Sequence, residues 1–182
     1  GRYRLEEMLG QGSTSRICRA FHQTLGVPVA IKVYRPTAEL TAAEMMDAFT
    51  HEAQMLAGLD HPHIVRVLDV DTEGQMPFIV FEYVGAMTLE DLIQSSGKLP
   101  PARVIEVGLE LALALEHAAE HRVLHRDIKP ANVLLKRDGA TKLADFGLAT
   151  TGVEAEHAEA PVCGSPAYMA PEQILDPSSV DH

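Results

Sequence analysis

Apart from one helix that starts near Thr41, the hydrophobic pattern of the chain is strand-like before residue 85 and helical after it, and this change limits the folds that are open to it. Before that point the apolar residues form short alternating segments separated by turn residues, which is typical of β-strands. These segments run over 3–9, 15–21, 27–34, 64–70 and 77–83. After residue 85 the periodicity is helical. The sequence therefore predicts a β-rich unit followed by a helix-rich one.

Local signals mark where the expected helices begin. Thr41 and Glu44 have the spacing of a capping box, and Thr88 with Asp91 marks the start of a short helix. Pro101 lies in the first turn of a long helix that we expect over 102 to about 121. Apolar residues surround this helix almost completely, so we expect it to be buried.

Composition and charge exclude several classes of protein. The chain has 182 residues and a formal net charge of −11, whereas a nucleic-acid-binding protein needs a basic face. It contains no run of about 18 apolar residues, so no membrane span is expected. Cys18 and Cys163 lack a metal-ligand spacing, which fits a reducing compartment and a cytoplasmic location. Because the first residue is Gly1 rather than Met, we expect a fragment boundary there.

The residues that most restrict the chemistry lie between 125 and 147. Residues 125–132 read HRDIKPAN, and Asp145 begins the later tripeptide DFG. Two acids and an amide with this spacing suit a magnesium-dependent phosphoryl transfer. Asp127 can accept or orient a hydroxyl proton, and Lys129 can reach the transferred group. Asn132 and Asp145 can hold Mg²⁺ against the phosphates of a nucleotide.

An acid in the first helix and a lysine in the third strand each need a partner. Glu52 shares one helical stripe with the apolar residues 45, 49 and 56, so it points inward. Lys32 ends the strand sequence VAIK, where alternation places it on the same face as Ala30 and opposite Ile31. A charge in either setting must reach water or meet an opposite charge.

Taken in order, these motifs resemble the protein kinase family. Gly10 and Gly12 match the first two glycines of its glycine-rich loop, which lets backbone N–H groups approach phosphates, whereas its third glycine is Ser15 here. The sequence GSPAYMAPE at 164–172 matches the end of its activation segment. The wording of HRDIKPANVLL and AYMAPEQ looks most like the eukaryotic-like (Hanks-type) serine/threonine kinases of bacteria.

The resemblance implies a role for each candidate residue. Asp127 would be the base, Lys129 the cation at the transferred phosphoryl group, and Lys32, paired with Glu52, the residue that binds the α- and β-phosphates. The metal ligands would be Asn132 and Asp145. Further nucleotide-binding residues are implied at Leu9, Gly10, Gly12, Ile17, Ala30, Phe81, Glu82, Val84 and Leu134.

The fold implied by the resemblance is α+β, two-lobed and protein-kinase-like, with an incomplete helical C-lobe. We expect the N-lobe over 1–84 and a partial C-lobe over 85–182, because the later helices of the family are missing. The implied activity transfers the γ-phosphoryl group of ATP, with Mg²⁺, to Ser or Thr hydroxyls of protein substrates. Lys129 together with Ser165 favours Ser/Thr over Tyr as the acceptor, and no nucleic-acid partner is expected.

Two alternatives stay open. The chain could bind ATP without turning it over, as an incomplete fragment. It could also be a small-molecule kinase of the same fold, although such enzymes generally lack the segment that contains Pro171 and Glu172.

One departure from the family pattern bears on regulation, because no Ser, Thr or Tyr lies between Gly152 and Gly164. Activation is therefore not expected to depend on a phosphate in that stretch, where Glu154, Glu156 and Glu159 could supply a weaker anion.

Overall fold

The structure, a computed structural model, describes residues 1–12, 15–34, 41–74, 76–146, 150–151, 164–176 and 180, with only the backbone at 150 and 151. The expectations that concern Gly147, Cys163 and the acids Glu154, Glu156 and Glu159 lie outside the described residues.

The chain forms two compact units. The first contains residues 1–57 and 66–83, and the second contains 58–65 and 84–182. The predicted boundary after residue 84 would place 58–65 in the first unit. This segment instead pairs with the second, where Val65 N donates to Leu143 O at 2.9 Å and Leu143 N donates to His63 O at 2.8 Å. The lobe boundaries themselves stay a prediction.

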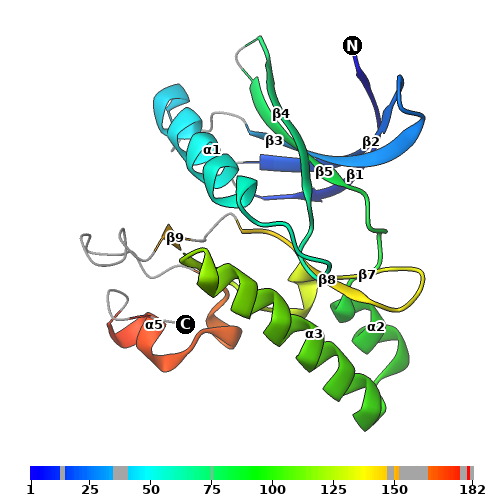
Figure 1. Cartoon of the computed structure of the whole chain (residues 1–182), viewed down its shortest axis with the longest axis vertical. Coiled ribbons are helices and arrows are strands. Elements are labelled where there is room, and N and C mark those ends of the chain that lie inside the picture. Colours follow the sequence, from blue (N-terminus) through cyan, green and yellow to red (C-terminus); the bar gives the residue numbers. More distant parts are fainter. Residues whose placement is uncertain are drawn as a thin grey trace. The chain divides into compact units, whose positions relative to one another are not determined.

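The first unit is built on an antiparallel five-stranded sheet in the order β1-β2-β3-β5-β4 (Figure 1). The predicted strands are present, but β4 begins at residue 67 rather than 64. Ile64 instead forms a backbone bridge with Leu143 in the second unit, and its side chain is buried there. The strands are β1 (Tyr3–Gln11), β2 (Ser15–His22), β3 (Val27–Tyr34), β4 (Val67–Glu73) and β5 (Met76–Glu82).

Helix α1 (Ala42–Ala57) begins at the predicted capping box and contacts β4 and β5. Glu44 Oε2 accepts from Thr41 N at 2.8 Å, and Thr41 Oγ1 accepts from Glu44 N at 3.3 Å. The stripe expected from the spacing is confirmed as buried, which carries Glu52 to the sheet. Its members are Met45, Phe49, Glu52 and Leu56.

The second unit combines helices with two short strand pairs, β6 with β9 and β7 with β8. Helix α2 starts where Thr88 and Asp91 predicted, and these two residues form a capping box, while α3 has Pro101 at its first position. The elements are α2 (Leu89–Ser96), α3 (Pro101–Glu120), β6 (Val123–Leu124), the 3-10 turn η1 (Pro130–Asn132), β7 (Val133–Leu135), β8 (Thr141–Leu143), β9 (Thr150–Thr151), the 3-10 turn η2 (Pro166–Tyr168) and α5 (Pro171–Leu175).

Helix α3 corrects one expectation, because its predicted burial on all sides was wrong. Val107, Ala114 and Ala118 are buried, but the side chains of Ile105 and Leu109 are 71% and 61% exposed. An apolar helix face is buried only where another element covers it, and among the described residues this face lies open to solvent. No helix in the described part of the chain is long and apolar enough to cross a membrane.

Candidate active site

A buried ion pair joins β3 to α1 in the first unit. Lys32 Nζ lies 2.9 Å from Glu52 Oε1 and 3.0 Å from Oε2, so both carboxylate oxygens accept from the ammonium group. The residues are 7% and 4% exposed. Charges this far from water require opposite charges beside them. The ion pair expected between these two residues is thus present.

Tyr34 completes the surroundings of Glu52, and sequence reasoning missed it. Its hydroxyl donates to Glu52 Oε2, and its ring meets the ring of Phe49 edge-on at 5.5 Å. Lys32 Nζ lies 5.4 Å from the Tyr34 ring centroid. The available signal was strand alternation, because Tyr34 follows Lys32 by two residues and therefore shares its face.

The sheet places five of the predicted nucleotide-binding residues on one face. Gly10 opposes Ile17 between β1 and β2, and Ile17 opposes Lys32 between β2 and β3. Ala30, two residues before Lys32, opposes Phe81 of β5. Directly opposed residues on neighbouring strands point to the same side of a sheet. Their role in binding a nucleotide stays a prediction.

Neither glycine of the predicted phosphate loop is required by the fold itself. Gly10 and Gly12 both avoid the left-handed backbone region, and a Cβ on Gly10 would meet no atom within 4 Å. On Gly12 a Cβ would make an ordinary contact with Ser15, at 3.8 Å. A remaining reason for glycine at these two positions is that it lets a ligand approach the backbone closely. Leu9, which precedes this loop, is exposed.

The remaining predicted adenine contacts are divided between the units. Glu82 ends β5, where its carboxylate accepts from Arg66 N at 2.9 Å and its N–H donates to Arg66 O at 3.0 Å. Val84 and Leu134 belong to the second unit, where Leu134 lies in β7. The involvement of these residues in nucleotide binding likewise stays a prediction.

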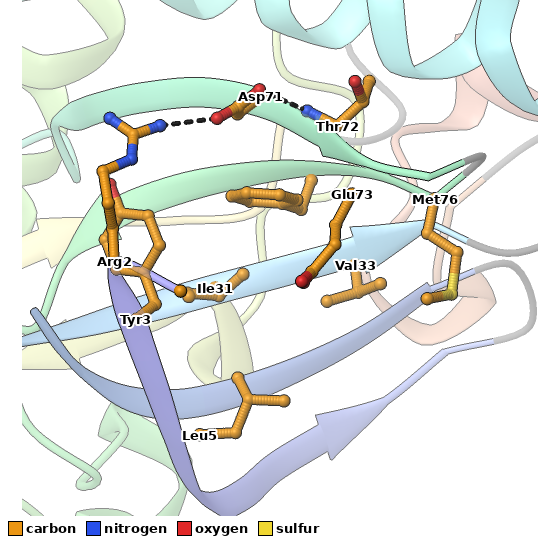
Figure 2. A pocket seen from close by; sticks show the side chains of 11 residues that line it. Arg2, Tyr3, Leu5, Ile31, Val33, Asp71, Thr72, Glu73 and Met76 are labelled. Carbon is orange, nitrogen blue, oxygen red and sulfur yellow. Dashed lines mark hydrogen bonds and ion pairs between the residues drawn. The ribbon is translucent and has the colours of Figure 1, made fainter.

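A cavity of about 390 Å³ is lined by residues of the sheet that include Tyr3, Ile31 and Val33 (Figure 2). Ile31 and Val33 flank Lys32 in sequence and line this cavity, because neighbouring strand side chains point to opposite faces. At its rim Arg2 pairs with Asp71 at 2.5 Å. Among the described residues that line it, none is predicted to bind the nucleotide. The cavity is therefore distinct from the candidate active site.

In the second unit, three neighbours surround the Asp127 carboxylate. Lys129 Nζ donates to Oδ2 at 2.6 Å and Asn132 Nδ2 donates to the same oxygen at 3.0 Å. The backbone N–H of Ser165 donates to Oδ1 at 3.0 Å. Lys129 Nζ also donates to Ser165 Oγ at 2.8 Å. Residues that lie far apart in sequence are thus brought into one hydrogen-bonded group.

The hydrogen bonds around Asp127 determine its protonation. Burial acts to raise its pKa, but hydrogen bonds from Lys129, Ser165 and Asn132, together with the Lys129 charge, outweigh burial and hold the pKa below its usual value. The group is therefore an ionised and weak base. It can orient a hydroxyl group. It can take the hydroxyl proton late in a reaction, once the hydroxyl oxygen has begun to form a new bond.

Backbone contacts bring the two predicted metal ligands near each other. Ala144 N, next to Asp145, donates to Asn132 O at 2.8 Å. Asn132 uses its Nδ2 for Asp127, which leaves its side-chain oxygen as the atom of choice for a cation. Asp145 is exposed and has a φ of 62°. Non-glycine residues in this region of backbone space cluster at functional sites.

Sequence reasoning also missed Gln173, in the first turn of α5. Its Nε2 donates to Arg126 O at 3.0 Å, which links α5 to the residue before Asp127. A signal was present, because Gln173 occupies the third helical position, where a glutamine side chain reaches back to the helix start. Its second bond, to the catalytic loop, depends on tertiary structure and has no local signature.

The comparisons with known proteins agree on one family. The family described as protein kinase domain matches residues 3–182. The chain is 40% identical over 182 residues to "Probable serine/threonine-protein kinase SCO3848" of Streptomyces coelicolor, covering 95% of this chain and 27% of that protein. It is 38% identical over 180 residues to serine/threonine-protein kinase PknB of Mycolicibacterium smegmatis, covering 94% and 28%. For serine/threonine-protein kinase PrkC of Bacillus subtilis the identity is 36% over 175 residues, covering 95% and 27%. The chain spans about a quarter of the length of these relatives.

Proposed function

The chain belongs to the protein kinase domain family, and we propose that it transfers the γ-phosphoryl group of Mg-ATP to serine or threonine hydroxyl groups of proteins. One observation carries the proposal, namely the Asp127 carboxylate with Lys129, Asn132 and Ser165 at 2.6–3.0 Å. An acid, a cation and an amide in contact match the needs of phosphoryl transfer to a hydroxyl group. The relatives reported above are named serine/threonine kinases, which supports the same activity.

In the proposed reaction the substrate hydroxyl oxygen forms a bond to the γ-phosphorus while the bond to the departing ADP oxygen breaks. The hydroxyl proton passes to the Asp127 carboxylate. Because the pKa of Asp127 lies below its usual value, this proton moves late, and orientation of the hydroxyl is the larger part of its role. Lys129 stabilises the charge on the transferred phosphoryl oxygens.

The predicted metal ligands fit Mg²⁺. This ion prefers hard oxygen atoms and is held in phosphotransfer sites by one or two protein groups together with phosphates and water. Asp145 offers a carboxylate, and Asn132 offers the side-chain oxygen left by its hydrogen bonds to Asp127. When bound, Mg²⁺ neutralises negative charge on the phosphates.

The first unit supplies the nucleotide-binding residues of the proposal. Glu52 fixes the position of the Lys32 ammonium group, which makes it a directed charge for the α- and β-phosphates. Gly10 and Gly12 let the backbone approach the phosphates. Contacts to the rest of the nucleotide are assigned to Leu9, Ile17, Ala30, Phe81, Glu82, Val84 and Leu134.

Two features support a protein hydroxyl as the acceptor. Ser165 contacts both Asp127 and Lys129, so the segment that begins at 164 meets the catalytic loop where an acceptor hydroxyl must lie. Pro171 and Glu172 begin α5 in the same segment, which small-molecule kinases of this fold generally lack.

A substitution pair in the full-length protein tests the proposal. Asp127→Asn removes the proton acceptor and should lower kcat by about 10²–10⁴-fold, with the KM for ATP near the wild-type value. The matched control is Asp138→Asn, an exposed carboxylate paired with Lys136 at 3.0 Å. It should leave kcat unchanged. Wild-type kcat in Asp127→Asn, or no phosphotransfer by the wild type, would overturn the proposal.

A further inference from the structure

The peptide unit that joins Arg126 to Asp127 is held at both of its polar ends. Its carbonyl belongs to Arg126 and its N–H to Asp127, so its orientation sets the direction in which the Asp127 side chain leaves the backbone. Arg126 has a φ of 64°, in a region that residues with a side chain rarely adopt. Such a conformation persists only where surrounding contacts impose it.

His125 holds the N–H end of this peptide. Asp127 N donates to His125 Nδ1 at 3.2 Å, and His125 Nε2 lies 3.1 Å from Ala144 O. A carbonyl only accepts, so Nε2 carries the ring proton and Nδ1 is the acceptor. Burial lowers the pKa of His125, which keeps the ring neutral and preserves this arrangement. Its ring packs against Phe146 at 4.6 Å.

Gln173 holds the carbonyl end. Its Nε2 donates to Arg126 O at 3.0 Å, and its Oε1 accepts from Ala170 N at 3.0 Å. The nitrogen and the oxygen of the Gln173 side-chain amide are thus both hydrogen-bonded. Together these two bonds determine that the nitrogen faces Arg126. Gly164 packs against the same carbonyl so closely that a Cβ there would lie 2.8 Å from the oxygen, and its φ of 121° also favours glycine. The carbonyl is therefore confined from two sides.

We propose that Gln173 is a positioning residue for Asp127. By donating to Arg126 O it fixes the plane of the Arg126–Asp127 peptide and, through it, the direction of the carboxylate that faces the acceptor hydroxyl. The inference rests on the proposed function for its kinetic consequence, whereas the geometry stands without it. A displacement of the base by about 1 Å is enough to lower a rate by about 10²-fold.

A purely structural role for Gln173 is the competing explanation. Its Oε1 satisfies Ala170 N at the start of α5, and this bond alone stabilises the helix end. The two roles use different atoms of one side chain, so they can be separated by substitution. Gln173→Glu keeps the acceptor for Ala170 N and loses the donor to Arg126 O. Gln173→Met keeps the length and loses both.

The kinetic test compares these variants in the full-length protein. Gln173→Glu should keep the thermal unfolding midpoint of the wild type and lower kcat by about 10-fold to 100-fold, with the KM for ATP unchanged. Gln173→Met should lower both the midpoint and kcat. A wild-type kcat in Gln173→Glu would overturn the inference, because only the cap would then matter.

A pH profile sharpens the comparison. As the pH falls toward the pKa of the introduced carboxyl, ordinarily about 4.3, its neutral form gains an O–H that can donate to Arg126 O. The kcat of Gln173→Glu relative to wild type should therefore rise toward acid pH. Taking the ratio to wild type cancels the titrations that both proteins share. A ratio that is flat or falls toward acid pH contradicts the inference.

Amide hydrogen exchange at Asp127 gives a readout that needs no activity. Loss of the Gln173 donor should speed exchange of the Asp127 N–H in Gln173→Glu, while amides in the middle of α3 keep their rates. Unchanged exchange at Asp127 overturns the inference. If the wild type transfers no phosphoryl group, the proposed function fails, and the exchange result still decides the role of Gln173.

Discussion

Two buried carboxylates in the described part of the chain are satisfied in different ways. Glu52 accepts from Lys32 and from the Tyr34 hydroxyl, whereas Asp127 accepts from one cation, one amide and one backbone N–H. The need of Glu52 for a partner was readable from its place on an apolar helical stripe. The contribution of Tyr34 was not, because strand alternation gives its face but not the reach of its hydroxyl.

The Lys32–Glu52 pair gives a prediction for stability. Glu52→Gln keeps the shape of the side chain but removes the carboxylate charge beside the buried Lys32 ammonium, so it should lower the free energy of unfolding by roughly 3–5 kcal/mol. Tyr34→Phe is the matched control, because it removes one hydrogen bond to a charged group, worth roughly 1.5–3 kcal/mol. Urea unfolding of both variants makes the measurement. A smaller loss in Glu52→Gln than in Tyr34→Phe would show that the charge of Glu52 is not what matters.

At the scale of elements, local signals predicted element types well and tertiary contacts poorly. The capping boxes at Thr41 and Thr88 placed two helix starts, since their hydrogen bonds form within a single turn. The start of β4 was set too early because Ile64 is buried outside that strand, beside its bridge partner Leu143. Burial of α3 was overestimated for the same kind of reason, because composition does not say which faces are covered.

The segment 58–65 packs against α3 through histidine rings, which predicts a pH effect on stability. The ring of His61 stacks on that of His117 at 5.2 Å and lies 5.6 Å from that of His63. Burial, followed by the charges of His117, His63 and Lys142, lowers the pKa of His61 from its ordinary 6.5. As the pH falls, His61 is therefore protonated in the unfolded chain before it is protonated in the folded chain. The contribution of neutral His61 to the free energy of unfolding is fully present above about pH 6.5. It is lost as the pH falls from there toward the pKa of His61 in the folded chain.

Urea unfolding between pH 8 and pH 5 tests this expectation with His61→Gln. The variant should show a shallower loss of unfolding free energy with falling pH than the wild type does. His125, whose pKa is also lowered, should leave a residual slope in both. Equal slopes for His61→Gln and the wild type would contradict the account of His61.

At the scale of the whole molecule, the sequence predicted the family and the fold class because the motifs are ordered and specific. Which nucleotide-binding residues work together stays a prediction, since the first unit holds Lys32 and Glu52 while the second holds Asp127, Asn132 and Asp145. Interactions between a residue of one unit and a residue of the other have no local signature in the sequence. The hydrogen bond of Gln173 to the catalytic loop was missed for a related reason.

The apolar face of α3 predicts the solution behaviour of the 182-residue chain. Ile105 and Leu109 are 71% and 61% exposed on neighbouring turns, so the chain should self-associate with rising concentration and bind a hydrophobic dye. The double change Ile105→Lys and Leu109→Glu should reduce both effects without lowering the free energy of unfolding. Leu25→Lys replaces an exposed leucine in the turn between β2 and β3 and should change neither effect. If dye binding persists in the double variant, the exposed hydrophobic surface that binds the dye lies elsewhere on the chain.

The most direct measurement follows the γ-phosphoryl group itself. The full-length protein is incubated with Mg²⁺, γ-labelled ATP and a mixture of protein acceptors, and the labelled residues are identified. The expected result is label on phosphoserine and phosphothreonine with the wild type and its near-complete loss with Asp127→Asn. Label found only on inorganic phosphate, on tyrosine or on a small molecule would contradict serine/threonine protein kinase activity.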